Sequence, residues 1–223
     1  MEPKIVKIIR VEPVTPNVNR FTLERPEGLT FIPGQAAEIS INLEGWKDEI
    51  RPFTFTGLTD WDHLEFTIKS YPDRKSVTDQ LAKLKPGNEL IIHKVFGAIH
   101  YYGEGTFIAG GAGVTPFIAI FRQLDKENKL GKNKLIFSNS TAKDIILKEE
   151  FTRMLGNNFI NTVTHEKTDL YDNRRVDEKY LSEKLEDFNQ YFYLCGPDPM
   201  VEDLHRSLLN LGVADEKIII EQF

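Results

Sequence analysis

A glycine-rich stretch in the middle of the chain combines residue types and spacing suited to binding a phosphate. Residues 105–117 read Gly-Thr-Phe-Ile-Ala-Gly-Gly-Ala-Gly-Val-Thr-Pro-Phe. Thr106–Ala109 is typical of a short buried strand, and the three glycines that follow predict a tight turn. Thr115 can cap a helix and Pro116 fits its first position, so we expect a helix to begin there. A helix N-terminus placed after a strand and a glycine turn binds anions in α/β proteins.

The same stretch also fits a connector that only lets a helix pack closely on a sheet. Pro116 stands where the usual dinucleotide-binding pattern has its third glycine. Nucleotide binding is therefore predicted only if further motifs support it.

Three other short motifs could carry chemistry. Arg51–Thr54 offers an arginine that can pair with a pyrophosphate, an aromatic ring that can stack and a hydroxyl for a ring heteroatom. Cys195–Met200 reads Cys-Gly-Pro-Asp-Pro-Met, and the sequence ends in Glu221–Phe223. Each motif also has a structural interpretation: an edge strand with a proline, a buried strand-end cysteine before a helix, and an apolar C-terminal plug.

The elements that must position these motifs change character near Tyr101–Glu104. Before this boundary, short strands separated by turns predict an antiparallel β-barrel or sandwich, with one short helix at Ser76–Lys83. After it, strands alternate with helices, which predicts a doubly wound parallel α/β sheet. We expect strands at 5–11, 20–23, 36–43, 50–58, 64–70, 89–95, 106–109, 134–138, 159–164, 190–195 and 217–221, and later helices at 115–128, 146–155, 177–185 and 197–211. The expected domains are residues 1–101 and 102–223.

Composition excludes several classes of protein. The 223 residues are 40% hydrophobic and 28% charged, as in an ordinary globular protein, and the net charge of −6 argues against nucleic acid as the main partner. No stretch approaches the ~18 apolar residues of a membrane span, and the alternating N-terminus is unlike a signal peptide, so we expect a cytoplasmic protein. A single cysteine, Cys195, excludes a disulfide framework, a four-cysteine zinc site and a cysteine-ligated iron–sulfur cluster. We expect no metal site.

Together, in this order and at these intervals, the motifs resemble those of the ferredoxin–NADP⁺ reductase family over nearly the whole chain. The family's Arg-x-Tyr-Ser/Thr flavin motif is similar to Arg51–Thr54, with Phe in place of Tyr. Its small polar residue at the start of the barrel helix is matched at Ser76–Thr78. Its Gly-Gly-x-Gly-x-Thr-Pro loop is matched by Gly110–Pro116, its Cys-Gly-Pro motif by Cys195–Pro197 and its Glu-x-aromatic ending by the last three residues.

The resemblance implies a β-barrel that binds FAD, followed by an α/β domain that binds NAD(P)H. The implied FAD contacts are Arg51, Pro52, Phe53, Thr54, Ser76, Val77, Thr78 and Phe223. The expected NAD(P) contacts are Gly110, Gly111, Gly113, Val114, Thr115, Pro116, Asn139, Arg175, Cys195, Gly196 and Pro197. Thr54, Cys195 and Glu221 would line the space where the nicotinamide meets the flavin, and they are the expected catalytic residues.

The sequence leaves the choice between NADH and NADPH open. Phe137–Thr141 lacks both the arginine that many NADPH-preferring relatives carry and an acidic residue for a ribose diol. Arg174 and Arg175 can supply phosphate charge from the neighbouring loop, or they are simply solvated. The Asn139–Leu147 stretch resembles the NADH-preferring branch and favours NADH.

The expected function is an FAD-dependent NAD(P)H oxidoreductase. A hydride would pass from nicotinamide to flavin, and single electrons would then leave to a separate carrier such as ferredoxin, flavodoxin, a cytochrome or an oxygenase component. A separate carrier is expected because one cysteine leaves no fused plant-type [2Fe–2S] domain. The alternatives are a reductase of free flavin or of a small molecule, and a non-catalytic subunit that keeps the fold.

Overall fold

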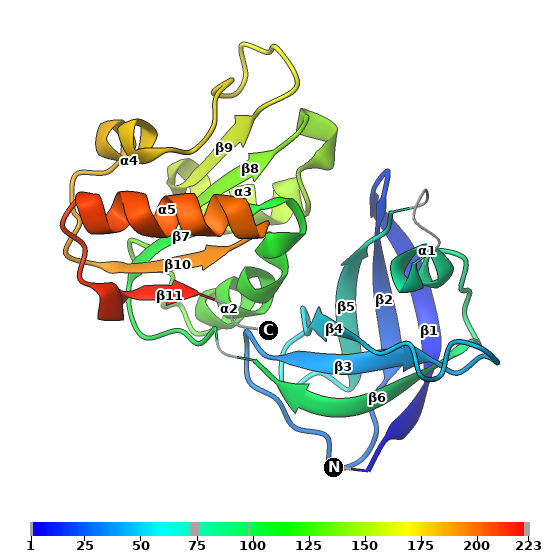
Figure 1. Cartoon of the computed structure of the whole chain (residues 1–223). Coiled ribbons are helices and arrows are strands. Elements are labelled where there is room, and N and C mark those ends of the chain that lie inside the picture. The colour runs from blue at the N-terminus through cyan, green and yellow to red at the C-terminus, as the bar shows by residue number, and fades with distance from the viewer. Residues whose placement is uncertain (1, 72–75, 98, 221–223) are drawn as a thin grey trace. The chain divides into compact units, whose positions relative to one another are not determined.

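The computed structural model describes residues 2–71, 76–97 and 99–220, which divide into two compact units (Figure 1). The first unit holds the chain up to His100 together with Thr115–Gln123, and the second holds Tyr101–Val114 and the chain from Leu124 onward. No helix within these described ranges is long and apolar enough to cross a membrane.

The first unit is an antiparallel β-barrel, as the sequence predicted. Its elements are β1 (Lys4–Thr15), β2 (Val18–Glu24), β3 (Ala36–Ile41), β4 (Arg51–Thr54), β5 (His63–Lys69), α1 (Val77–Leu81) and β6 (Glu89–Phe96). The six strands lie in the order β4-β3-β6-β1-β2-β5, with antiparallel neighbours throughout. An antiparallel bridge between Phe55 and Phe66 joins the two ends of this order, and the Thr56 N–H donates to the Glu65 carbonyl oxygen at 2.9 Å. The sheet therefore closes on itself.

Residue alternation along the strands fills the barrel. In β1, Val6 and Ile8 are buried in the interior, whereas Ile5 and Ile9 are exposed on the outer face. This is the period of two that a strand with one buried face requires. Helix α1 adds two further buried residues, Val77 and Leu81, to the same core.

The sequence predicted one strand over residues 50–58, but the observed strand β4 ends at Thr54, so the predicted length is wrong. The reason is that the chain changes its pairing strand within this segment. β4 pairs with β3 only as far as Thr54, which lies opposite Ala36. The Phe55 N–H still donates to the Gln35 carbonyl oxygen at 3.0 Å, just before β3, but Phe55 also forms a bridge with Phe66 of β5, and the Thr56 N–H donates to Glu65 of β5. The change of partner closes the barrel, and it cannot be read from hydrophobic alternation, which continues through the segment.

A buried ion pair lies inside the first unit. Arg122, from the part of α2 (Thr115–Lys126) that belongs to this unit, donates to Glu65 Oε1 at 2.6 Å and to the Thr56 carbonyl oxygen at 2.7 Å. The Thr56 hydroxyl donates to the same Glu65 oxygen at 2.8 Å, and the Arg122 guanidinium lies 5.4 Å from the centre of the Trp61 ring. Glu65 is 5% exposed and Arg122 9%. Both charges are thus paired and hydrogen-bonded, the condition under which burial of charge is tolerated.

The second unit is a parallel α/β sheet, which confirms the second half of the predicted fold. Its elements are β7 (Gly105–Gly110), a 3₁₀ turn (Gly111–Val114), the end of α2, β8 (Lys134–Asn139), α3 (Lys148–Leu155), β9 (Phe159–Val163), α4 (Glu178–Lys184), β10 (Tyr191–Cys195), α5 (Asp198–Asn210) and β11 (Ile218–Ile220). The five strands lie in the order β11-β10-β7-β8-β9, all parallel. The chain moves outward from β7 in one direction and returns to β10 on its other side, so the topological switch point lies between β7 and β10.

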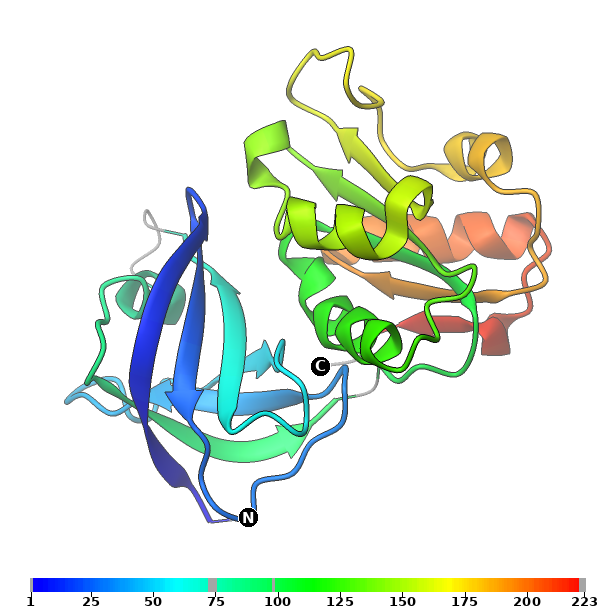
Figure 2. The ribbon, with the colours of Figure 1, turned by 180° about the vertical axis from the view of Figure 1, so that it is seen from behind.

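Helices cover both faces of this sheet. α4 and α5 lie on one face (Figure 1), and α3 lies on the other, which Figure 2 shows from behind. Under α4 and α5 the buried side chains of Ile108, Phe192 and Leu194 pack against Tyr180 and Leu204.

Tyr193 of β10 anchors the segment that enters the sheet. Its hydroxyl accepts hydrogen bonds from the backbone N–H groups of Tyr102 (2.9 Å) and Gly103 (3.1 Å), and it donates to the Gly103 carbonyl oxygen (2.8 Å). Burial is the main reason that the pKa of Tyr193 is raised to about 12. The neutral Tyr193 hydroxyl thereby holds in place the backbone of Tyr102 and Gly103, which leads into β7.

We expect removal of Arg122 to destabilise the protein strongly, because buried Glu65 would lose its closest counter-charge, and Arg20, with Nε 4.0 Å from Glu65 Oε2, is too distant to replace that hydrogen bond. Breaking one partner of a buried pair costs about 3–5 kcal/mol. Arg122→Met should lower the free energy of unfolding by that amount in urea denaturation, and Arg122→Met combined with Glu65→Gln should lose less than Arg122→Met alone. Equal urea midpoints for wild type and Arg122→Met would contradict this account of the pair.

Candidate functional site

The turns that follow β7 and β10 meet at the switch point of the sheet. A Cβ atom at Gly113 would lie 2.3 Å from the backbone oxygen of Cys195, closer than real contacts allow. A Cβ at Gly110 would lie 2.6 Å from Met200 Sδ, and one at Gly196 would lie 3.1 Å from the Gly110 nitrogen. The structure therefore brings together the two motifs that the sequence singled out after separate strands. Close backbone approach is the reason for the glycines.

The helical run after β7 begins earlier than the sequence predicted. Gly111–Val114 forms a 3₁₀ turn that leads directly into α2 at Thr115, and Gly111 has a φ of 53°, which favours glycine. Thr115 is consequently inside the helical run rather than its N-cap, and Pro116 is in its second turn rather than at its first position. The positive end of the helix dipole lies at such a start, and the turn holds no acidic residue. The arrangement suits an anion.

Asn139, at the end of β8, has a buried side chain without a partner. It is 5% exposed, and neither its Oδ1 nor its Nδ2 has a hydrogen-bond partner among the described residues. The register Gly110–Ser138 places Asn139 level with Gly111, beside the 3₁₀ turn. A buried amide normally finds partners. A ligand with hydroxyl or phosphate oxygens at this turn would provide them.

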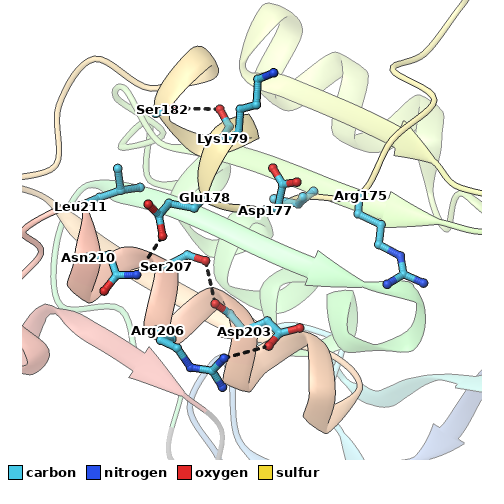
Figure 3. Close-up of a pocket in the computed structure, with 11 residues that line it drawn as sticks. Arg175, Asp177, Glu178, Lys179, Ser182, Asp203, Arg206, Ser207, Asn210 and Leu211 are labelled. Atoms are coloured by element: carbon cyan, nitrogen blue, oxygen red, sulfur yellow. Dashed lines mark hydrogen bonds and ion pairs between the residues drawn. The ribbon is translucent and has the colours of Figure 1, made fainter.

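A pocket of about 300 Å³ opens beside these turns, at the carboxyl ends of β8, β9 and β10. Its lining residues are Ser138, Thr164, Arg175, Val176, Pro197, Pro199, Met200 and Asp203. The size and the mixture of apolar walls with a few polar groups are those of a small-molecule site. A second hollow of about 740 Å³ lies between α4 and α5 and shares Arg175, Val176 and Asp203 with it (Figure 3). Arg175 and Pro197 were predicted from sequence.

Sequence reasoning did not assign six of the eight lining residues to the site: Ser138, Thr164, Val176, Pro199, Met200 and Asp203. Met200 and Asp203 are three residues apart at the start of α5, so they lie on one helix face. This spacing directly after the Cys-Gly-Pro motif was the available signal. Thr164 follows β9 by one residue, where ligands of a parallel sheet are expected.

The flavin-type motif of the barrel forms β4, beside β3. Arg51 is exposed and bonds to Glu49 Oε2 (3.1 Å) and to the Ile50 carbonyl oxygen (2.7 Å). Phe53 is half-buried and packs partly against the barrel core, and Thr54 is buried. The aromatic ring thus contributes to packing, as its structural interpretation proposed.

The second flavin element forms the start of α1, which also contacts β3. Ser76 is the N-cap of α1: its hydroxyl accepts from the Asp79 N–H at 3.4 Å and lies 2.9 Å from the Thr78 hydroxyl. β3 thus has Arg51–Thr54 paired to it and Ser76–Thr78 close by, with Val77 buried between the two polar residues. Glu221 and Phe223 lie outside the described residues.

Two family models of known proteins match parts of the chain. The family model for oxidoreductase FAD-binding domains matches residues 5–101, and that for oxidoreductase NAD-binding domains matches residues 107–206. A curated relative, NADH-cytochrome b5 reductase 2 of Mycosarcoma maydis, is 29% identical over 216 residues. The alignment covers 86% of this chain and 61% of that protein, so the chain spans less than two thirds of the relative's length.

Solved structures share the fold. The flavohem-like FAD/NAD-binding domain of nitric oxide dioxygenase from Vibrio cholerae superposes with a TM-score of 0.88 at 22% identity, covering 100% of this chain and 99% of that one. A ferredoxin NADP⁺ reductase from Neisseria gonorrhoeae, solved with bound FAD and NADP, gives 0.84 at 20% identity, with 99% and 98% covered.

Gly113 provides a direct test of the crossing turns. Gly113→Ala puts a methyl group against the Cys195 backbone, and we expect this overpacking to cost about 1–3 kcal/mol and to weaken NAD⁺ binding at least tenfold. The affinity is measured by calorimetry and the stability by urea denaturation.

Gly212→Ala is the matched control, because a Cβ there meets nothing within 4 Å and only the φ of 86° is strained. It should cost about 1–2 kcal/mol and leave NAD⁺ affinity unchanged. Wild-type NAD⁺ affinity in Gly113→Ala would show that the turn does not need this close approach.

Proposed function

Because the chain belongs to the ferredoxin–NADP⁺ reductase-like oxidoreductases, which join an FAD-binding to an NAD-binding domain, we propose that it is an FAD-dependent NAD(P)H oxidoreductase. The observation that carries the proposal is the meeting of Gly110–Thr115 and Cys195–Pro199 at the switch point of the sheet. The functional domains of the proposal are residues 1–101 for the flavin and 102–223 for the nicotinamide nucleotide.

In this proposal the second unit holds the nucleotide by its phosphates. The start of the helical run at Gly111–Thr115 faces the pyrophosphate, because the positive end of the helix dipole lies there and no acidic residue opposes an anion. The side-chain amide of Asn139, which has no partner among the described residues, hydrogen-bonds to an adjacent ribose. The adenine lies in the 300 Å³ pocket against Val176 and Met200. Cys195, Gly196 and Pro197 line the part of the site that takes the nicotinamide ring.

The flavin is held by the first unit. Arg51 exchanges its surface partner Glu49 for the FAD pyrophosphate, a bidentate charge-assisted contact. Amides at Ser76–Thr78 assist, and Phe53 and Thr54 face the ring system. The resemblance would add Glu221 and Phe223, which lie outside the described residues, to the flavin environment.

The bound FAD supplies the chemistry that the side chains lack, since it accepts a hydride and releases electrons one at a time. Thr54 would orient the flavin ring and Cys195 the nicotinamide ring, and the resemblance adds Glu221 to these catalytic residues, because close and aligned approach is what hydride transfer requires of a protein. The electrons pass to a separate one-electron carrier. A haem protein of the cytochrome b5 type is the favoured carrier and NADH the favoured donor, because the curated relative is named for both.

The proposal predicts a yellow protein that a nicotinamide nucleotide bleaches. Purified protein reconstituted with FAD should show flavin absorbance near 450 nm, and anaerobic NADH should remove that band faster than NADPH does. Oxidised cytochrome b5 added afterwards should restore it. Bound flavin that neither nucleotide bleaches would reject the enzyme and favour a non-catalytic subunit.

Arg51 tests the flavin site separately from the nucleotide site. Arg51→Ala should weaken FAD binding at least tenfold, equivalent to about 1.4 kcal/mol, as measured by fluorescence titration of the apoprotein. Arg10→Ala is the control, because Arg10 is similarly exposed and similarly paired, to Glu12 at 3.5 Å. Equal FAD affinity in both variants would remove Arg51 from the flavin site.

A further inference from the structure

The 300 Å³ pocket at the strand ends has two charged side chains of opposite sign in its wall. These are Asp203 of α5 and Arg175 of the loop before α4, and they are the charged residues among its lining. Both also line the neighbouring 740 Å³ hollow, whose lining Figure 3 shows, so the two spaces share this pair of residues. A ligand that fills the smaller pocket and extends outward meets this pair of charges.

The rest of the lining fits an adenosine. Val176 and Met200 provide apolar surface for a planar base, and Ser138 and Thr164 provide hydroxyl groups at the ends of β8 and β9. The pocket lies beside the glycine turn at which the proposed function places the pyrophosphate. The charged pair therefore stands where a ribose, with or without a 2′-phosphate, has to be accommodated.

The two charges act in opposite directions on a 2′-phosphate. A carboxylate accepts hydrogen bonds from sugar hydroxyls but repels a phosphate monoester, which carries about −1.5 to −2 charges at neutral pH. A guanidinium attracts that phosphate. The preference for one nucleotide thus depends on which side chain is better placed before the ligand arrives.

Asp203 is the better placed of the two. It is a short side chain on the body of a 13-residue helix, and its carboxylate is 3.6 Å from Arg206 Nη1 in an ion pair in which both side chains are largely exposed. Such an exposed ion pair contributes little to stability, and the Asp203 carboxylate can still accept hydrogen bonds from a ligand. Arg175 is a long exposed side chain without an ion-pair partner among the described residues, so binding a phosphate must first restrict its rotamers.

We propose that Asp203 is the residue through which this chain selects an adenosine ribose without a 2′-phosphate, and that Arg175 opposes that selection. The inference rests on the proposed function for the position of the nucleotide, and it deepens that function by naming its specificity residue. In other dinucleotide-binding sheets an acidic residue after the second strand binds the ribose hydroxyls. The corresponding segment of this chain, Phe137–Thr141, contains no acidic residue, and we assign that role to Asp203.

The test measures binding rather than turnover. Calorimetry of the FAD-loaded full chain gives dissociation constants for 5′-AMP and for adenosine 2′,5′-bisphosphate, and their ratio is the readout. Asp203→Asn should shift the ratio at least tenfold toward the bisphosphate, and Asp203→Ser should do the same. Arg175→Gln should shift it in the opposite direction.

Glu202→Gln is the matched control, because it removes the same charge from the neighbouring exposed residue of α5, which does not line the pocket. The ratio should stay within twofold of wild type. An unchanged ratio in Asp203→Asn, or an equal shift in Glu202→Gln, would overturn the assignment. If wild type binds neither ligand, the pocket is no adenosine site and the inference is overturned. The proposed function is judged separately, by bleaching of the flavin with NADH.

Discussion

Two backbone turns approach each other at the centre of the sheet more closely than side chains would permit. The turn after β7 passes the end of β10 so closely that a methyl group on Gly113 would overlap the Cys195 carbonyl. The strand order makes this meeting unavoidable, because β7 and β10 are neighbours although 80 residues of chain separate them. The turn amides, the buried Asn139 amide and the 300 Å³ pocket all lie around this point. The absence of a side chain at Gly110, Gly113 and Gly196 thus lets the two turns approach each other, and this approach shapes both the fold and the proposed site.

The barrel depends on a different kind of interaction. Its closure uses Phe55 and Thr56 to switch from β3 to β5, and the Thr56 carbonyl, Glu65 and Arg122 then form a buried, fully bonded cluster at the closing seam. Arg122 lies seven residues into α2, the helix that follows directly from the glycine turn. Through these contacts Arg122 is part of the barrel unit.

Local sequence patterns predicted the two-part architecture and most of the elements. Period-two alternation revealed the barrel strands, and the change to alternating strands and helices revealed the sheet. The features that sequence reasoning missed depend on contacts between distant residues. Arg122 pairs with a glutamate 57 residues away, and Asp203 reaches the pocket only because α5 returns over the sheet. Thr115 was expected to cap a helix because its type suits a cap, but the helical run extends back to Gly111, whose positive φ only the backbone reveals. The roles of Glu221 and Phe223 rest on resemblance alone.

In the proposed function a nicotinamide nucleotide binds at the crossing of the two turns. Amide hydrogen exchange of the FAD-loaded protein, measured with and without saturating NAD⁺, tests it most directly. The account predicts that exchange slows at Gly111–Thr115 and around Cys195–Met200, where ligand contacts should stabilise turn amides, and stays unchanged in peptides from β1 and β2. Unchanged exchange at both turns, with protection appearing elsewhere in the chain, would contradict it.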